Sequence, residues 1–472
     1  MPTSKPDPFD PFLWTHEITT HVYDISSGLQ PISTRDQIVR GALLVRRAWH
    51  AGIINSQPGH GVLVVGAGVG GAAVALQAAY MGIPVTLIEK RPYPFVRQRF
   101  CATRIIDTTL YDWPAAHWTN VRHPWHPNDE FPLVVAMDLA HRNAREWQTA
   151  LEHATALFPH FQIRYRTRLV NFPIEPTNGL FAAHLDDNTT DQFRMIVLAA
   201  GVGQERRRRS KFRSYRFWDT DRLETVDHTD RVLISGGGDG ALQDFLRVAL
   251  KPHTHLRRLM QKLKISAEDL HRFQDWTAHG KSYFVWCGTV GHEHDCERFL
   301  HRENEEFIVD LLSGPHSNII IKALEDSVRE VNELPEIHLA FPCDHFTRCY
   351  TVNRFLAILV ARFIDLRAKG GRRTLREFQG LADVKCVHDI SQTPSRRSCF
   401  RARHTVTWTA QDCSLQSVLR DVPPPETYTV IVLRHGTIPE PCAAMGVEKD
   451  ALKRGPYKFT RHVLPAHLGH LP

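Results

Sequence analysis

The residues with the clearest potential for chemistry lie between positions 66 and 89 of this chain. Gly66, Gly68 and Gly71 follow a short apolar run, and Glu89 ends a second apolar run after a helix-forming stretch. A dinucleotide-binding βαβ unit needs this order. The glycines allow a tight turn and a close approach to a pyrophosphate, and the acid accepts hydrogen bonds from ribose hydroxyls. The spacing therefore predicts a nucleotide site.

A helix that begins at this turn directs free N–H groups and the positive end of its dipole toward the phosphates. The candidate contact residues of this first site are Gly66, Ala67, Gly68, Val69, Gly70, Gly71, Glu89, Lys90 and Arg91. A carboxylate favours a free ribose 2′-hydroxyl and repels a 2′-phosphate. Glu89 thus predicts that the site holds FAD or NAD rather than NADP.

Another turn of small residues follows the strand expected over residues 194–199. Ala200 and Gly201 lie in this turn, and their small size lets the backbone pass close to a bound nucleotide a second time. Val170, on a strand expected over residues 162–172, is a further candidate cofactor contact. These positions extend the first site.

The glycine motif recurs after an apolar run at residues 231–235. Gly236, Gly238 and Ala241 have the G-x-G-x-x-A spacing, Asp239 lies between them, and a helix-forming stretch follows. This motif predicts a second dinucleotide site. No apolar strand that ends in an acid follows at the usual distance, so the motif does not distinguish NADH from NADPH.

The elements expected around these motifs alternate between helices and strands. Their ranges are helices at 37–49 and 140–158, and strands at 162–172, 179–185 and 194–199. Residues 316–364 have the pattern of strand, helix, strand and helix. Such alternation is typical of α/β proteins. We predict a Rossmann-type FAD-binding domain and a second, Rossmann-like dinucleotide-binding domain.

The motif positions divide the chain into four parts. They are an N-terminal helical extension at 1–60, a first dinucleotide-binding domain at 61–227, a second one with helical insertions at 228–440, and a tail at 441–472. The chain is 42% hydrophobic and 23% charged, which is typical of a globular protein. At 472 residues the chain is long enough to form two hydrophobic cores.

The nine cysteines contain no C-x-x-C pair, which disfavours the reductases that pass electrons through two neighbouring thiols. Scattered cysteines in an odd number are typical of reduced thiols. Residues 61–83 carry no charge and are long enough for a membrane helix, but their glycines favour a turn. No signal peptide is visible, so we expect a soluble, cytoplasmic protein.

Much of the net charge of +7 lies in one run, made of Arg206–Arg209, Lys211 and Arg213. The run could hold an anionic substrate, a cofactor phosphate or nucleic acid, and a solvated loop explains it equally well. The remaining composition favours a small-molecule substrate, with neither nucleic acid nor a membrane as partner. Only this basic run leaves nucleic acid as an alternative partner.

Several other local patterns have ordinary explanations. Two groups of potential metal ligands lack zinc-site spacing, namely His292, His294 and Cys296, and Cys343, His345 and Cys349. With 28 histidines such groups arise by chance, and we expect no metal. Arg434–Gly436 matches the start of a histidine phosphatase, but its late position favours the end of a strand. Tyr111–Pro114 predicts a cavity wall or plain aromatic packing.

The order of these motifs resembles that of the two-dinucleotide-domain flavoproteins. That family includes the pyridine-nucleotide oxidoreductases and the N-hydroxylating and Baeyer–Villiger flavin monooxygenases. The resemblance covers roughly residues 60–245 and the strand that ends at Gly436. It implies that the ADP half of FAD binds Gly66, Gly68, Gly70, Gly71 and Glu89, and that NAD(P)H binds Gly236, Gly238, Asp239 and Ala241. The family's usual Ala-Thr-Gly on the closing strand is here Arg434, His435 and Gly436.

The resemblance implies an FAD-dependent oxidoreductase, in which the flavin carries the redox chemistry and the protein orients it. The leading expectation is reduction by NADH or NADPH, followed by reaction with oxygen and hydroxylation of a small molecule. One alternative is a flavin oxidase or dehydrogenase that takes its hydride directly from the substrate. Another is a nucleotide-binding sensor that docks through Arg206–Arg213. No catalytic residue stands out in the sequence.

Overall fold

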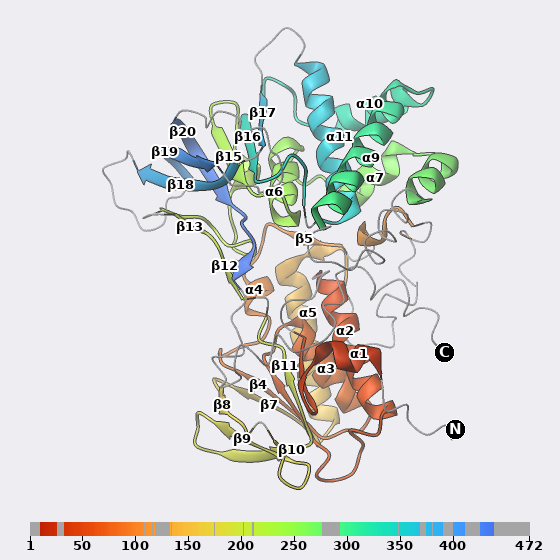
Figure 1. Ribbon diagram of the computed structural model, residues 1–472, viewed down its shortest axis with the longest axis vertical. Helices are drawn as coiled ribbons and strands as arrows, with labels where there is room; N and C mark the ends of the chain where they lie inside the picture. Colours follow the sequence, from red (N-terminus) through yellow and green to blue (C-terminus); the bar gives the residue numbers. More distant parts are fainter. Residues whose placement is uncertain are drawn as a thin grey trace. The chain divides into compact units, whose positions relative to one another are not determined.

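The computed structural model describes residues 10–25, 33–107, 110–115, 118, 133, 135–173, 175–201, 203–209, 212–275, 293–347, 349–368, 374–379, 381–389, 400–410 and 425–438. The chain forms two compact units. Unit 1 comprises Met1–Thr108, Val121–Gln204 and Thr437–Pro472, and unit 2 comprises Thr109–Asn120 and Glu205–Gly436. Each unit contains a six-stranded sheet (Figure 1).

The sheet of unit 1 has the strand order β1-β2-β11-β3-β4-β7. The bounds are β1 Glu17–Thr19, β2 Val22–Asp24, β3 Val62–Val65, β4 Val85–Glu89, β7 Phe161–Tyr165 and β11 Met195–Leu198. Neighbours from β2 to β7 are parallel, and β1 is antiparallel to β2. The chain runs from β3 to β4 on one side, while β11 lies on the other side of β3. The switch point between β3 and β11 is where such sheets bind nucleotides.

Helix α3 (Val69–Tyr80) joins β3 to β4, and α5 (Ala140–Leu157) precedes β7. Helix α3 is buried along nearly its whole length because the sheet covers one face and α2 (Thr34–His50) packs directly on another (Figure 1). Its run of alanines, valines and glycines fits this double burial. Residues 61–83 thus form β3, the glycine turn and α3, as the turn interpretation predicts. Among the described residues, no helix is both long and apolar enough to cross a bilayer.

The strand expected over residues 162–172 is wrong as a single element. Strand β7 belongs to the main sheet, whereas β8 (Leu169–Asn171) joins β9 (Phe181–Leu185) and β10 (Thr190–Phe193) in a three-stranded antiparallel sheet. Arg166 breaks the run with a φ of 58°, which ends an extended strand. The small elements of unit 1 are α1 Pro11–His16, α4 Val96–Arg99, β5 Ile105–Ile106 and β6 Asp138–Leu139.

The N-terminal residues are part of the first domain rather than a separate extension. Strand β2 pairs in parallel with β11, and α2 covers the helix that follows the first glycine turn. The packing of the two helices is close at Gly41, where a Cβ would lie 2.6 Å from the carbonyl oxygen of Gly70 and 3.0 Å from Cβ of Ala73. The boundary expected at residue 60 therefore cuts through one core.

We predict that Gly41→Ala destabilises the protein. Alanine is intrinsically better in a helix by about 1 kcal/mol, but the clash with backbone at Gly70 forces α2 away from α3, and overpacking costs about 1–3 kcal/mol. Urea unfolding should show a lower free energy of unfolding. Arg46→Ala, at an exposed position of the same helix, is the control and should leave it unchanged. A stabilised Gly41→Ala protein would contradict close packing of α2 on α3.

The sheet of unit 2 has the order β17-β16-β15-β20-β19-β18 (Figure 1). The bounds are β15 Arg231–Ser235, β16 Glu336–Phe341, β17 Leu375–Gln379, β18 Leu381–Asp389, β19 Phe400–Ala410 and β20 Glu426–Leu433. Strands β17, β16, β15 and β20 run parallel, and β19 and β18 continue antiparallel. The strand β15 is followed by α6 (Asp239–Ala249), and β20 lies on its far side. Unit 2 therefore has the same switch point as unit 1.

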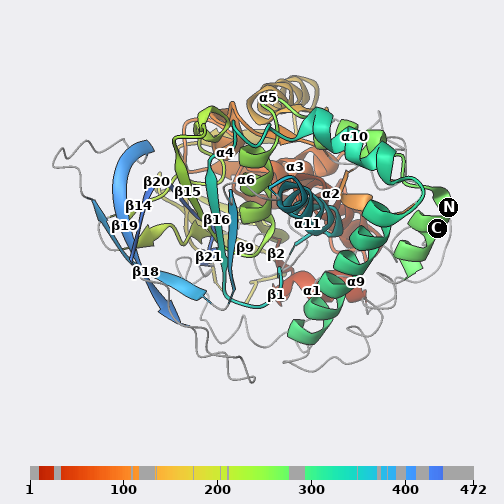
Figure 2. The ribbon, with the colours of Figure 1, turned by 90° about the horizontal axis from the view of Figure 1, so that it is seen from above.

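Helices α6 and α11 (Thr351–Arg367) pack on each other and on strands of the unit 2 sheet (Figure 2). Between α6 and β16 the chain inserts α7 (Leu256–Leu263), α9 (Glu293–Ser313) and α10 (Ser317–Ser327). The insertion explains why no second strand follows the second motif at the usual distance. The first strand expected within 316–364 is wrong, because α10 buries Ile320, Ala323 and Leu324 at helical spacing.

Unit 2 begins earlier in the sequence than expected. The divide falls between Gln204 and Glu205 rather than after residue 227, and Phe212 packs into the unit 2 core. Residues 109–120 also belong to unit 2, where Leu110 and Trp113 join the main hydrophobic cluster. The small elements here are η1 Leu110–Asp112, β12 Gln204–Glu205, β13 Arg208–Arg209, β14 Phe212–Arg213 and η2 Leu223–Thr225, and β21 Thr437–Ile438 follows unit 2. The expected tail lies outside the described residues.

Candidate functional site

The first glycine turn connects β3 to α3 at the switch point of unit 1. Gly66 has a φ of 108°, and its N–H donates to the carbonyl of Ile88 at 2.8 Å. A Cβ on Gly66 would lie 2.5 Å from the carbonyl oxygen of Ala199, and a Cβ on Gly71 would lie 1.9 Å from that of Gly66. Both positions require glycine because the turn brings backbone segments into contact.

Gly68, the N-cap of α3, has the opposite environment. Its φ is −78°, and a Cβ there would meet no atom within 4 Å. No side chain caps the first N–H groups of α3. Open space beside uncapped N–H groups at a helix N-terminus is what a pyrophosphate needs.

Glu89 ends β4 beside this turn and is 9% exposed. Its Oε2 accepts a hydrogen bond from the N–H of Ala67 at 2.9 Å, and its Oε1 accepts one from the N–H of Arg91 at 2.9 Å. A carboxylate accepts about four hydrogen bonds, so each oxygen has capacity left for a ribose hydroxyl. The side chains of Lys90 and Arg91 are exposed. Glu89 both fixes the turn and presents an acceptor beside it.

A second backbone segment borders the turn where β11 ends. The N–H of Ala199 donates to the carbonyl of Val65 at 2.9 Å, and Gly201, with a φ of 92°, has open space where a Cβ would be. Ala200 and Gly201 are exposed beside it. The residues around the first turn therefore fit the diphosphate and ribose of FAD.

Two residues that the motifs did not indicate hold the loop after β4 at this turn. The N–H of Phe95 donates to the carbonyl of Ala67 at 2.9 Å. Arg97 donates from Nη2 to the carbonyl of Gly203 at 2.7 Å, which places a cation beside the segment that follows β11. Phe95 and Arg97 belong to the N-terminal end of the four-residue helix α4, which is too short to have a periodic pattern, so sequence reasoning could not select them.

The second glycine turn, between β15 and α6, repeats the backbone arrangement of the first. Gly236 has a φ of 140°, its N–H donates to the carbonyl of Ala340 at 2.8 Å, and a Cβ there would lie 2.3 Å from the carbonyl oxygen of Arg434. Gly238 is the N-cap of α6, with a φ of −101° and no side-chain cap. Ala241 is fully buried, as close packing of helix on strand requires.

The loops that border the second glycine turn also correspond to the loops that border the first. Thr347 donates its N–H to the carbonyl of Gly237 at 3.0 Å, as Phe95 does to Ala67 in unit 1. Gly436 follows β20 with a φ of 74° and open space at its Cβ, as Gly201 follows β11. The backbone of a dinucleotide cradle is therefore present twice.

The two cradles differ in the side chain that ends the neighbouring strand. In both units the residue before the glycine turn pairs with the penultimate residue of the neighbouring strand, so the strand ends correspond. Glu89 ends β4, and its counterpart at the end of β16 is Phe341, which is 1% exposed. The second cradle has no carboxylate at the ribose position.

Asp239, the first residue of α6, links the second turn to the start of α11. Its Oδ1 accepts hydrogen bonds from the N–H of Tyr350 and from Nδ2 of Asn353, both at 2.7 Å. Burial raises the pKa of Asp239 from 3.8 to about 6, while the hydrogen bonds from Asn353 and Tyr350 act in the opposite direction. The candidate Asp239 thus lies at the second turn, but its carboxylate already has structural partners.

We predict that Asp239→Asn reduces the pH dependence of stability. Because the folded pKa is raised, the folded state keeps its proton while the unfolded state loses it, so stability falls as pH rises from about 4 to about 6, by up to about 3 kcal/mol. Asparagine retains the acceptor oxygen without the charge. Urea unfolding at both pH values should give a flatter dependence in the variant. An identical dependence in both proteins would contradict the raised pKa.

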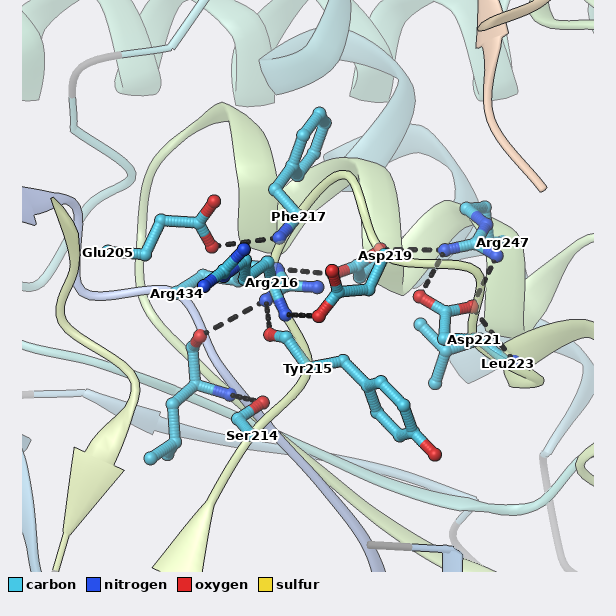
Figure 3. Close-up of polar contacts among 12 residues, drawn as sticks. Glu205, Ser214, Tyr215, Arg216, Phe217, Asp219, Asp221, Leu223, Arg247 and Arg434 are labelled. Atoms are coloured by element: carbon cyan, nitrogen blue, oxygen red, sulfur yellow. Dashed lines mark hydrogen bonds and ion pairs between the residues drawn. The ribbon is translucent and has the colours of Figure 1, made fainter. Parts of the chain in front are cut away.

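Arg434 occupies the position of Ala199 in the second unit and is held by internal partners (Figure 3). Its Nε donates to Oδ2 of Asp244 at 2.7 Å, and its Nη1 donates to the carbonyl of Tyr215 at 2.7 Å. The side chain is 5% exposed, and that of Asp244 is fully buried. The charge of Arg434 is thus balanced within unit 2, so the residue anchors β20 to α6. The strand interpretation of Arg434–Gly436 is confirmed.

Asp244 also accepts a hydrogen bond from Arg247. Arg247 in turn pairs with Asp221 (Figure 3) and with Glu224. Although burial alone would lower the pKa of Arg247, the bond to Asp221 and the neighbouring carboxylates raise it. Beside Arg434, Oγ of Ser235 and Nε2 of His435 lie 2.7 Å apart. Polar side chains therefore replace the small residues that border the first turn.

The other candidates lie in less specific surroundings. Val170 is on β8 of the three-stranded sheet and half exposed, so its cofactor contact stays a prediction. Trp113 is buried with ring distances of 4.5 Å to Phe355 and 5.1 Å to Phe273, which supports aromatic packing. Within the described ranges, no three potential ligands gather as a metal site, and His292 lies outside them.

Residues 61–270 match the model of the family described as FAD dependent oxidoreductase. The match begins at β3 and includes the first cradle and the second glycine turn. The chain contains an FAD-dependent oxidoreductase domain over these residues. FAD is its cofactor, and the first cradle, with Glu89 and Gly68, has the geometry to hold the ADP half.

Solved structures with related folds include several flavoproteins. The bacillithiol disulfide reductase of Bacillus cereus is 11% identical, with 82% of this chain and 81% of that chain covered and a TM-score of 0.39. The thioredoxin reductase of Lactococcus lactis is 10% identical over 83% of both chains, with a TM-score of 0.37. A cyclohexanone monooxygenase from Rhodococcus sp. Phi1 is 12% identical, covering 84% and 73%, with a TM-score of 0.36. A comparison with curated proteins found no match.

Proposed function

We propose that this flavoenzyme is reduced by a nicotinamide dinucleotide bound at the second glycine turn. The observation that carries the proposal is the repetition of the cradle. Gly236 and the uncapped N-cap Gly238 occupy the same backbone positions as Gly66 and Gly68. The free N–H groups of an uncapped helix end beside a glycine turn are suited to a phosphate.

We further propose that the reduced flavin reacts with oxygen to hydroxylate a small molecule. Enzymes that reduce disulfides need two neighbouring thiols, and the nine cysteines of this chain include no C-x-x-C pair. FAD supplies the hydride acceptor and the reactivity toward oxygen. Among the described residues, Cys101, Cys296, Cys343 and Cys349 form no disulfide bond, which is consistent with the reducing cytoplasm as the proposed location.

The basic run does not change the proposed partner. Arg206 and Arg208 are exposed, whereas Arg207 is partly buried and donates to the carbonyl of Ser214 at 3.0 Å. Lys211 lies outside the described residues. We propose a small-molecule substrate and assign no nucleic-acid role to the run.

The experiment is anaerobic stopped-flow mixing of the FAD-loaded protein with NADH or NADPH. We expect bleaching of the long-wavelength flavin band, followed by reoxidation when oxygen is admitted. Bleaching by an amine or alcohol but by neither nicotinamide nucleotide would replace the proposal with a flavin oxidase or dehydrogenase. No reduction by any donor would favour a sensor.

A further inference from the structure

The second cradle differs from the first at the residue that begins the helix after the glycine turn. Helix α3 begins with Val69, which carries no charge, whereas α6 begins with Asp239. Asp239 directly follows the N-cap Gly238 and is partly buried. The positive end of a helix dipole favours an anion. In the second cradle a carboxylate is therefore already present at the helix end that would bind a diphosphate.

The hydrogen bonds of Asp239 leave one of its oxygens for a proton. The two donors at the start of α11, the N–H of Tyr350 and Nδ2 of Asn353, both bind Oδ1. Among the residues that the structure describes, no donor binds Oδ2 and no cation pairs with the carboxylate. The bonds to Oδ1 can form whether or not Oδ2 carries a proton. Asp239 can therefore be charged or neutral within the same fold.

The charged groups near Asp239 do not hold it in the ionised form. Arg354 on α11 pairs with Glu297 on α9, and both side chains are buried. Their effects on Asp239 oppose each other, because Glu297 raises its pKa and Arg354 lowers it. The thiol of Cys349 adds no charge, since burial raises its pKa. Burial is the largest effect on Asp239 and raises its pKa to about 6.

A diphosphate at this helix end would shift the equilibrium between the two forms. An ionised Asp239 repels the phosphates, whereas a protonated one has no charge and gains an O–H donor. Bound phosphates therefore favour the neutral form and raise the pKa of Asp239 above its value in the free protein. A ligand that raises a pKa takes up protons when it binds.

We infer that binding of a dinucleotide at the second turn is coupled to protonation of Asp239, so that the site fills more readily as pH falls. The inference rests on the proposed function, because it assumes that the second cradle binds a nicotinamide dinucleotide. Affinity should be highest below the pKa of about 6 in the free protein and should fall as pH rises above it. Val69 provides no such group in the first cradle.

The test is calorimetric titration of the FAD-loaded protein with NAD⁺ and NADP⁺ at about pH 5.5 and about pH 8. Asp239→Asn keeps the acceptor oxygen without the charge. From the lower to the higher pH, the affinity of wild type should fall roughly 10-fold more than that of Asp239→Asn, which corresponds to a pKa rise of about one unit on binding. The 2′-phosphate of NADP⁺ also titrates, but it does so equally with both proteins, so their difference isolates residue 239.

Asp326→Asn on α10 is the matched control, since Asp326 is 44% exposed and pairs with Lys322, and it should behave as wild type. Titration of wild type at neutral pH in two buffers of different ionisation enthalpy should show proton uptake, and this measurement does not depend on the folding of any variant. An equal fall in affinity for wild type and Asp239→Asn, or binding without proton uptake, overturns the inference and leaves the proposed function intact. Failure of wild type to bind either nucleotide at either pH overturns the proposed function itself.

Discussion

Gly68→Val should yield a folded protein without flavin. The Cβ of residue 68 would enter open space beside the N-terminus of α3, where the structure leaves room for a diphosphate. With a φ of −78°, the position accepts any residue without backbone strain. Loss of two or more charged hydrogen bonds corresponds to at least about 100-fold weaker binding. The purified variant should be colourless, and added FAD should not raise its melting temperature.

Two glycines nearby provide the contrast. Gly71→Ala places a Cβ 1.9 Å from the carbonyl oxygen of Gly66, so we expect loss of both flavin and fold. Gly61→Ala lies at the start of β3, with its nearest contact at an ordinary 3.5 Å, and should keep both. The comparison must use apo-proteins, because bound FAD itself raises the melting temperature. A yellow Gly68→Val protein would place the flavin elsewhere.

Gly238→Val should abolish reduction by nicotinamide nucleotides while the flavin stays bound. Gly238 caps α6 as Gly68 caps α3, and its backbone, with a φ of −101°, accepts valine. The two turns belong to different units, each with its own sheet. Stopped-flow bleaching of the flavin by NADPH should slow by at least about 100-fold, for the same loss of phosphate contacts.

Chemical reduction with dithionite is the control for this variant, since it bypasses the nucleotide and should bleach wild type and Gly238→Val equally. Unchanged bleaching by NADPH in Gly238→Val would show that the second turn is only scaffold. Loss of the flavin as well would mean that the turn supports the fold of unit 2 rather than a separate cofactor.

The glycine motifs made both cradles predictable, because a tight turn and close backbone approach restrict the residue type. The short apolar run before Gly66 and the helices expected at 37–49 and 140–158 appear as β3, α2 and α5, and the helix ends are displaced by at most a few residues. Strongly periodic apolar segments identify such elements without tertiary information. Asp239 was placed at the second turn, although its bonds to Tyr350 and Asn353 were not foreseeable.

The parts that sequence could not predict depend on contacts between distant segments. The end of the second strand of unit 2 could not be found from the sequence, because the helical insertion with α7, α9 and α10 lies between α6 and β16, and because Phe341 lacks the carboxylate by which this position is recognised. The entry of residues 110–118 into unit 2 rests on Trp113, whose partners Phe273 and Phe355 lie far along the chain. The role of β1 and β2 as sheet strands likewise depends on β11, since three-residue strands have no periodicity.

The helical insertion of unit 2 also affects the order in which the chain can fold. Every parallel partner of β3 and β4 is present once the chain has been synthesised to Leu198. Strand β15, by contrast, pairs with β16, which begins at Glu336, and with β20, which begins at Glu426. Such non-local pairing slows folding, and synthesis proceeds from the N-terminus. We therefore expect the flavin cradle to form first, on the ribosome. We expect β15 and α6 to keep their apolar surface exposed until the last third of the chain has been synthesised.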